Sequence, residues 1–375
     1  MPILPTGTFV TRVWRPGLGP CLALHRDGDL IDITNRATPT MRDLLERGDL
    51  PAYLATVAGT LIAPLTTLDH HEPAPDSLHL LSPADLQAIK ACGVTFARSM
   101  IERVIEERAA GDPSRADTIR ARVTAAIGDS LRNLKPGSPE AAEVKRLLLA
   151  ENLWSQYLEV GIGPDAEVFT KAPPMASVGY GASVGLHPIS KWNNPEPEVV
   201  LAVDSRGQIK GAALGNDVNL RDVEGRSALL LGKAKDNNAA AAIGPFIRIF
   251  DAGFGIDDVR NLELTLTVTG EDGFALTGRS SMAEISRDPL DLVAQTVAAH
   301  QYPDGFMLYC GTMFAPVQDR DGPGQGFTHH LGDRVTIAAP QLGALTNTVR
   351  LATEAPPWTF GTMALMRNLA GRGLI

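Results

Sequence analysis

The chain has 375 residues, of which 44% are hydrophobic and 21% are charged, and this composition excludes a disordered chain and a fibrous array. A formal net charge of −9 without basic runs argues against non-specific binding to nucleic acid or to an anionic membrane. Cys21, Cys92 and Cys310 provide neither a disulfide framework nor the spacing of a zinc site. The lack of a signal-peptide pattern and of an 18-residue apolar run predicts a cytoplasmic location.

The first 80 residues predict a small α+β domain. Residues 8–14 alternate between apolar and polar side chains, as in a strand that is buried on one face. Two more strands are expected at 21–25 and 30–33, because Asp27-Gly28-Asp29 between them is typical of a hairpin turn. Residues 40–47 have the spacing of a short amphipathic helix, and a proline-containing polar connector follows at 70–77.

A helical insertion is predicted at 99–159. Ile101, Val104 and Ile105 form one apolar stripe, and a second stripe runs through 139–157. Ser138 followed by Pro139 is typical of a helix start, since serine caps the first turn and proline suits its first position.

The rest of the predicted catalytic domain, residues 81–375, returns to strands and turns. Strands are expected at 199–203, 208–214, 262–269, 274–277, 305–309 and 334–338. Helices do not alternate with them at βαβ spacing, so a doubly wound parallel sheet is disfavoured. The combined share of the 36 glycines and 27 prolines in the chain exceeds the average share of roughly 12% for these two residue types. This surplus favours a turn-rich sheet protein.

Two glycine-rich segments do not match nucleotide-binding motifs. The spacing in 179–185 is one residue too long for a dinucleotide motif, and the residues after it are not those of a helix. Residues 322–326 lack the Lys-Ser/Thr of a phosphate-binding loop. We interpret 322–326 as a turn, with an active-site loop as the alternative.

The most informative pattern is a pair of acids, Glu196 and Glu198, directly before an apolar run. Side chains alternate along an extended segment, so both carboxylates face the same side. The pair is either a solvated sheet edge or two oxygen ligands of a hard divalent cation such as Mg²⁺ or Mn²⁺. Asp217, one strand later, is a candidate third ligand, and Lys233 or Lys235 is a candidate partner for the acids or for a substrate carboxylate.

The acid pair and the residues after it resemble the fumarylacetoacetate hydrolase superfamily. The signature of that superfamily is E-x-E, then N-D-x-x-A-R-D about twenty residues on, then a lysine about eighteen further on. Here Asp217 lies 21 residues after Glu196, and Lys235 lies 18 residues after Asp217, which selects this lysine over the one two positions earlier. With the Gly-Thr turn of the family at 311–312, four motifs agree in order and spacing, and the resemblance covers residues 80–375.

Within the superfamily, the chain is more similar to the branch that dehydrates sugar acids, in the segments 88–108, 154–171, 300–329 and 356–374. This resemblance implies an α+β, mostly β fold whose mixed sheets form a rolled β-sandwich. It also implies a homodimer or homotetramer and conversion of a 2-keto-3-deoxypentonate of the D-xylonate or D-arabinonate type to 2,5-dioxopentanoate. No redox cofactor is expected, and Mg²⁺ (or Mn²⁺) would bind to Glu196, Glu198 and Asp217.

The resemblance assigns further roles. Lys235 and Glu167 are the candidates for acid and base, and which residue takes which role stays open. Lys171 is expected to pair with a carboxylate, that of Glu167 or of the substrate, and Thr312 to bond the substrate carboxylate. The remaining expected substrate contacts are Arg98, Ser99 and Asn216, with a turn-forming role as the alternative for Asn216.

One departure from the hydrolases is informative. Their motif G-L-N-Y-x-x-H supplies a histidine that activates water, whereas this chain has Ser99 at that position. Without the histidine, water attack on a diketo acid loses its general base. Elimination is therefore favoured over the alternative, a hydrolase or decarboxylase that cleaves a C–C bond. Ser99 is expected either to bond a substrate oxygen or to cap the helix after it.

The histidines are a minor part of the prediction. His300 is interpreted as structural, with a substrate contact as the alternative. His329 and His330 are candidates for the mouth of the site.

Overall fold

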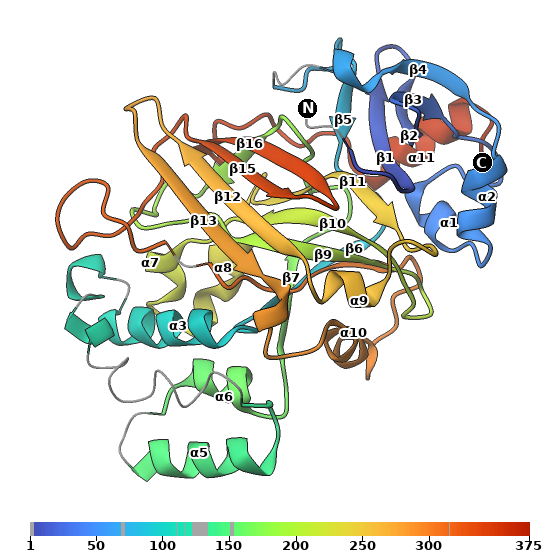
Figure 1. The fold of residues 1–375 in the computed structure, drawn as a ribbon. Helices are drawn as coiled ribbons and strands as arrows, with labels where there is room; N and C mark the ends of the chain where they lie inside the picture. The colour runs from blue at the N-terminus through green and yellow to red at the C-terminus, as the bar shows by residue number, and fades with distance from the viewer. Residues whose placement is uncertain are drawn as a thin grey trace.

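The computed structural model describes residues 4–68, 72–110, 112–116, 118–121, 134–150, 154–314 and 316–375. Their strands form two sheets, which lie face to face in Figure 1. The 11-stranded sheet consists of β1 (Phe9–Arg15), β2 (Gly19–Arg26), β3 (Asp29–Asp32), β4 (Thr60–Pro64), β5 (His79–Leu81), β6 (Ala88–Gly93), β7 (Glu167–Ala172), β9 (Pro197–Val203), β10 (Ile209–Asp217), β11 (Ala241–Ile249) and β14 (Phe306–Tyr309). The five-stranded sheet consists of β8 (Ser183–Leu186), β12 (Glu263–Thr269), β13 (Ala275–Ser281), β15 (Arg334–Ala339) and β16 (Gly343–Leu351).

Both sheets are mixed and mostly antiparallel. The pairs β6/β14 and β8/β16 are parallel, and the other strand pairs of both sheets are antiparallel. The predicted mostly β fold with mixed sheets is confirmed, as is the lack of a doubly wound parallel sheet. Within the described ranges, no helix has both the length and the apolar character needed to cross a bilayer.

The large sheet is buried on both faces. All seven residues of β9 are buried, which explains its continuous apolar run. Side chains of one parity, such as Val199 and Leu201, pack on the smaller sheet, whereas Val200 and Ala202 pack with the helices near the N-terminus. Those helices are α1 (Met41–Leu45) and α2 (Leu50–Thr56), of which the sequence predicted only α1. The acid pair therefore lies at the start of a strand in the middle of a two-sided core.

The N-terminal strands continue the large sheet. β1 pairs with β2 over its full length and also with β11, so the first strands hydrogen-bond directly to the rest of the chain. The C-terminal helix α11 (Thr362–Gly371) lies beside these strands in Figure 1, and Asn368 Nδ2 donates to the Leu18 carbonyl at 2.8 Å. The division at residue 80 stays a prediction.

The insertion is helical where it is described. Its helices are α3 (Ala97–Ala109), α5 (Pro139–Ala150) and α6 (Gln156–Ile162), and they share a separate small core that includes Val104, Ile105 and Leu158. In Figure 1, α5 and α6 lie away from the two sheets. As predicted, α5 starts at Pro139, and Ser138 Oγ accepts a hydrogen bond from the Ala141 N–H at 3.1 Å.

The described residues also form four 3₁₀ helices, η1 (Leu65–Thr67), η2 (Pro113–Arg115), η3 (Ala228–Leu230) and η4 (Met282–Glu284). Four further α-helices of the described part of the chain are short. They are α7 (Arg221–Glu224), α8 (Leu231–Lys235), α9 (Ile256–Val259) and α10 (Pro289–Val297). The glycine-rich segment 179–185 leads into strand β8 and not into a helix, which agrees with the exclusion of a dinucleotide site. The second one, 322–326, is a turn in which the Asp319 carboxylate accepts the N–H groups of Gly324 and Gly326.

Candidate active site

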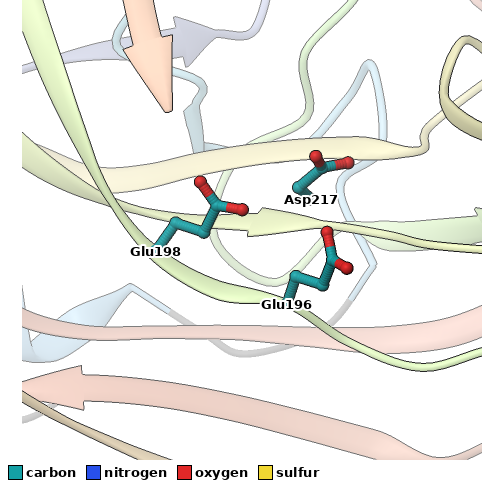
Figure 2. Close-up of side chains that lie close together, drawn as sticks. All are labelled: Glu196, Glu198 and Asp217. Carbon is teal, nitrogen blue, oxygen red and sulfur yellow. The ribbon is translucent and has the colours of Figure 1, made fainter. Parts of the chain in front are cut away.

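Three carboxylates point toward one another at the centre of the large sheet, as Figure 2 shows. They belong to Glu196, Glu198 and Asp217, and one oxygen from each lies within 4.8 Å of the others. All three residues are at most 3% exposed. The sequence left two interpretations of the glutamate pair open, and this burial excludes the solvated sheet edge.

The register of β9 and β10 explains the convergence. The two strands are antiparallel neighbours in which Gly215 pairs with Glu198 and Asn216 with Pro197. The Asp217 N–H donates to the Glu196 carbonyl at 3.1 Å, which aligns the start of β9 with the end of β10. Side chains two residues apart share a face of a sheet, so this register brings the third carboxylate to the acid pair.

Two buried lysines pair with the acids. Lys235 Nζ lies 2.7 Å from Glu196 Oε2 and 3.1 Å from Asp217 Oδ2. Lys171 Nζ lies 2.7 Å from Asp217 Oδ1 and also donates to the carbonyls of Val218 and Lys235. Lys235, which the spacing of the family signature favours over Lys233, is 3% exposed. Lys171 was expected to pair with a carboxylate, that of Glu167 or of the substrate, and β7 directs its ammonium to the carboxylate of Asp217 instead.

Burial and close charges shift the pKa values of these groups. Burial, together with the nearby Asp217 and Glu196, raises the pKa of Glu198 well above its usual range. Burial opposes the charge of Lys235, but Asp217, Glu196 and Glu224 outweigh it and raise its pKa, so Lys235 is held as an ammonium. The two lysines outweigh burial at Asp217 and lower its pKa.

The triad opens onto a small cavity of about 20 Å³. Most of the predicted site residues line it, together with residues that the sequence did not indicate. The lining is Cys92, Gly93, Val94, Ser99, Arg103, Glu167, Phe169, Glu196, Glu198, Asp217, Glu224, Lys235, Gly311 and Thr312. Histidine does not occur among these described residues.

Glu167 lies at the start of β7, opposite Gly93 of β6. A Cβ atom at Gly93 would lie 1.9 Å from Glu167 Oε2, so the missing side chain makes room for the carboxylate. Burial, together with the nearby Glu224, raises the pKa of Glu167 to about 7. A carboxyl group with this pKa can exchange a proton near neutral pH.

Ser99 and Thr312 both line the cavity, as predicted. The alternative that Ser99 caps its helix is wrong: the N-cap of α3 is Phe96, and the Ser99 hydroxyl donates to the Phe96 carbonyl at 3.0 Å. Thr312 Oγ1 accepts from the Phe314 N–H at 3.1 Å. The Gly311 N–H donates to Glu198 Oε2 at 2.6 Å, so the Gly-Thr turn also positions a member of the triad.

Two predicted substrate contacts lie outside the cavity lining. Lys171 is fully buried behind Asp217. Asn216 is also fully buried, but it lies in strand β10 and not in a turn, and its Oδ1 accepts the Glu196 N–H at 3.1 Å. The side chain of Arg98 lies outside the described residues.

His300, His329 and His330 are not among the described residues that line the cavity. His300 stacks on Tyr302 with ring centroids 4.5 Å apart, which favours the structural interpretation. His329 is buried against Asp333 at 3.1 Å, and His330 contacts Asp272 and Asp321. Both take part in ion pairs around the turn at 322–326, and a role of His329 and His330 at the mouth of the site stays a prediction.

The sequence missed Arg103 and Glu224. Arg103 Nη2 forms a short ion pair with Glu196 Oε1, and Arg103 Nη1 lies 3.3 Å from Glu224 Oε2. Arg103 left only the charged stretch at 102–108 as a signal, and such a stretch is typical of any solvated helix.

The donor set of the triad suits a hard divalent cation. It offers three carboxylate oxygens and no sulfur or imidazole, which is the preference of Mg²⁺ and Mn²⁺. Oxygens bound to one Mg²⁺ at about 2.1 Å lie at most about 4.2 Å apart. The spread of 4.8 Å is thus within small side-chain rotations of a ligand set.

Comparison with known proteins identifies the family. The model of the fumarylacetoacetate hydrolase C-terminal region matches residues 160–350, about half of the chain. The chain belongs to the fumarylacetoacetate hydrolase family.

Two curated relatives are named as dehydratases. One, from Haloferax volcanii, is named "Probable 2-keto-3-deoxyxylonate dehydratase", and the chain is 27% identical to it over 88% of its own length and 94% of the relative. The other, a 2-dehydro-3-deoxy-D-arabinonate dehydratase from Saccharolobus solfataricus, is 30% identical over 41% of this chain and 51% of the relative.

Solved structures share the fold. A 2-keto-3-deoxy-D-arabinonate dehydratase complexed with magnesium and 2,5-dioxopentanoate superposes with a TM-score of 0.63 at 20% identity, over 92% of this chain and 99% of that one. A fumarylacetoacetate hydrolase from Exiguobacterium antarcticum superposes with a TM-score of 0.55 at 15% identity, over 92% and 99%. The predicted fold is thus confirmed. Because a dehydratase and a hydrolase share it, the fold does not decide the reaction, which has to be argued from the site.

Proposed function

We propose that the protein is a divalent-cation-dependent hydro-lyase. Its substrate is a 2-keto-3-deoxypentonate of the D-xylonate or D-arabinonate type, and its product is 2,5-dioxopentanoate. The observation that carries the proposal is a cavity in which a buried carboxylate triad, a charged lysine and a glutamic acid with a pKa of about 7 meet, with no histidine among the described residues that line it. The names of the two curated relatives support the same reaction.

In this proposal Glu196, Glu198 and Asp217 hold Mg²⁺ or Mn²⁺. The bound cation would polarise the 2-keto group and so make the protons at C3 more acidic. Gly311 keeps Glu198 in place through its N–H. Lys171 supports Asp217 from behind the cavity, which makes it a positioning residue and not a substrate ligand.

Glu167 is the proposed base, and Lys235 supplies fixed positive charge. The sequence left this assignment open. The raised pKa of Lys235 keeps it protonated, so it is unsuited to remove a proton and suited to stabilise the developing enolate. With a pKa of about 7, a substantial fraction of Glu167 is ionised at neutral pH and can accept a proton from C3.

The proposed reaction removes one water molecule in two stages. Glu167 takes a proton from C3, and the C4 hydroxyl leaves with a proton as water. Loss of a proton from C5 and return of a proton to C3 then give an enol with a C4=C5 double bond. Transfer of the proton of the enol hydroxyl to C4 gives the C5 aldehyde, so no oxidant or reductant is needed. Ser99 and Thr312 are proposed to hold substrate oxygens from the cavity wall.

The pH dependence of the reaction should report on Glu167. A base has to be deprotonated, so kcat/KM should fall about tenfold per pH unit below about 7 and level off above it. Glu167→Gln should lower kcat by about 10² to 10⁴-fold and abolish this acidic limb. Asp165→Asn, at an exposed position two residues earlier, is the matched control. An acidic limb that persists in Glu167→Gln would contradict the assignment.

The class of product distinguishes the proposal from its alternative. Purified protein is incubated with D- and L-2-keto-3-deoxypentonates and Mg²⁺, and carbonyl products are trapped with semicarbazide. We expect one five-carbon semialdehyde from each substrate molecule consumed. Two smaller fragments would instead indicate a hydrolase or decarboxylase of the same family.

The oligomeric state and the location of the protein stay predictions. We propose a homodimer or homotetramer, and a cytoplasmic enzyme of carbohydrate catabolism whose partner is a small sugar acid. Light scattering of the purified protein measures the oligomeric state.

A further inference from the structure

The insertion helix α3 contributes a cation to the carboxylate triad. Arg103 contacts three buried carboxylates: Glu196 through Nη2, Glu106 through Nη1 at 2.7 Å, and Glu224 through Nη1 at 3.3 Å. Its side chain is 12% exposed and lines the cavity. Arg103 and Glu196 are 93 residues apart in the sequence. A helix outside both sheets thus supplies a positive charge to the carboxylate triad.

Both carboxylate oxygens of Glu196 already have a cationic partner in this arrangement. Its Oε1 is paired with Arg103 and its Oε2 with Lys235. A divalent cation that takes Glu196 as a ligand therefore has to compete with one of these two side chains. Lys235 is the more deeply buried of the two and also holds Asp217. Arg103 is the more exposed and keeps Glu106 and Glu224 as partners if it gives up Glu196.

The size of the cavity also supports a movement of Arg103 away from Glu196. A volume of about 20 Å³ accommodates roughly one water molecule, which is far too little for a five-carbon acid. Side chains that line the cavity have to move before an organic anion can enter. Arg103 is the partly exposed cation among them, so its guanidinium can meet the anion as it leaves Glu196.

We propose that Arg103 exchanges Glu196 for substrate: it opposes the divalent cation in the free protein and attracts the anionic substrate. The proposal rests on the proposed metal site, but not on which sugar acid is dehydrated. It has a distinctive consequence, because removal of one side chain should change metal affinity and substrate affinity in opposite directions.

The test compares three variants of the full-length protein at pH 8. Titration calorimetry measures Mg²⁺ binding to the metal-free protein without substrate, and steady-state kinetics at saturating Mg²⁺ gives KM and kcat. Arg103→Met should bind Mg²⁺ about tenfold more tightly, because it removes both the competitor for Glu196 and a repelling charge. It should also raise KM about tenfold and change kcat less than about threefold.

Two variants separate charge from structure. Arg103→Lys retains the positive charge and should return both constants to within about threefold of wild type. Arg120→Met removes another arginine that pairs with α3, through Glu102 at 2.9 Å, and should leave both constants unchanged. If Arg103→Met does not fold, Arg103→Gln carries the same expectation.

The test distinguishes a failure of the role proposed for Arg103 from a failure of the proposed function. Absence of Mg²⁺ binding to the wild-type protein would overturn the metal site itself. Normal binding to wild type with unchanged or weaker binding to Arg103→Met would overturn only the role of Arg103. A parallel loss of metal affinity, substrate affinity and thermal stability would likewise show that Arg103 is merely structural.

Discussion

Replacement of Glu198 by Gln is expected to lower kcat/KM by about 10³-fold or more, even with excess Mg²⁺. The amide preserves the shape of the side chain but removes one of three ligand charges at the centre of the sheet. Charge stabilisation by a bound cation contributes several kcal/mol to such transition states, and each 1.36 kcal/mol corresponds to about a tenfold change in rate. Mg²⁺ binding, measured by calorimetry, should weaken in parallel.

The effect should be local to the site. Glu198 is buried and its pKa is raised well above the usual range, so the neutral amide should be tolerated by the fold. The thermal midpoint in EDTA is therefore expected to stay at or above that of wild type. Glu354→Gln, at an exposed position, is the control and should retain full activity. Full dehydratase activity in Glu198→Gln would rule out the triad as the metal site.

Replacement of Lys235 by Met should damage both activity and stability. The ammonium contacts Glu196 and Asp217, and without it Glu196 keeps only Arg103 and Asp217 only Lys171 as a cationic partner. Removal of one partner of a buried ion pair costs about 3–5 kcal/mol. The loss, measured by urea denaturation, should be larger in EDTA than in Mg²⁺, because a bound cation compensates the same carboxylates and stabilises the folded state by mass action.

Lys235→Met should also lower kcat under conditions in which the variant is folded. With saturating Mg²⁺, kcat should fall by about 10³-fold, because the fixed positive charge beside the developing enolate is lost. Lys233→Met is the matched control, since Lys233 lies two residues earlier and is exposed. An unchanged kcat in Lys235→Met would remove this lysine from the chemistry.

The carboxylate triad could be predicted from the sequence because strand geometry determines it. Glu196 and Glu198 share a face through the two-residue repeat of an extended segment, and the spacing of the family signature selected Asp217 and Lys235. The structure adds the register of β9 and β10 that brings these side chains together. Glu167 was likewise expected, although only its burial reveals the raised pKa.

The partners of the buried charges could not be predicted, because tertiary packing chooses them. For Lys171 the sequence suggested a carboxylate partner, either Glu167 in its own strand or the substrate, yet the packing of β7 against α8 and the end of β10 gives it Asp217. Arg103 reaches Glu196 from a helix that is distant in sequence. A charged residue in a helix is usually solvated, so nothing local marked Arg103 as part of the site.

Some elements of the fold could not be predicted from the sequence either. β11 runs through alanines and Pro245, a composition that does not indicate a central strand. Its neighbours in the sheet explain why it forms: β1 and β10 pair with it on either side, and all nine of its residues are buried. Tertiary context thus overrode the weak local preference.

The central claim is that a divalent cation at the triad enables water elimination from a 2-keto-3-deoxypentonate. Proton NMR can follow purified protein with 2-keto-3-deoxy-D-arabinonate or 2-keto-3-deoxy-D-xylonate, first with Mg²⁺, then after addition of EDTA, and then after excess Mg²⁺ is restored. The account predicts that signals of 2,5-dioxopentanoate grow with Mg²⁺, stop growing in EDTA and resume when Mg²⁺ returns. Product formation at an undiminished rate in EDTA, or cleavage of the carbon chain, would contradict it.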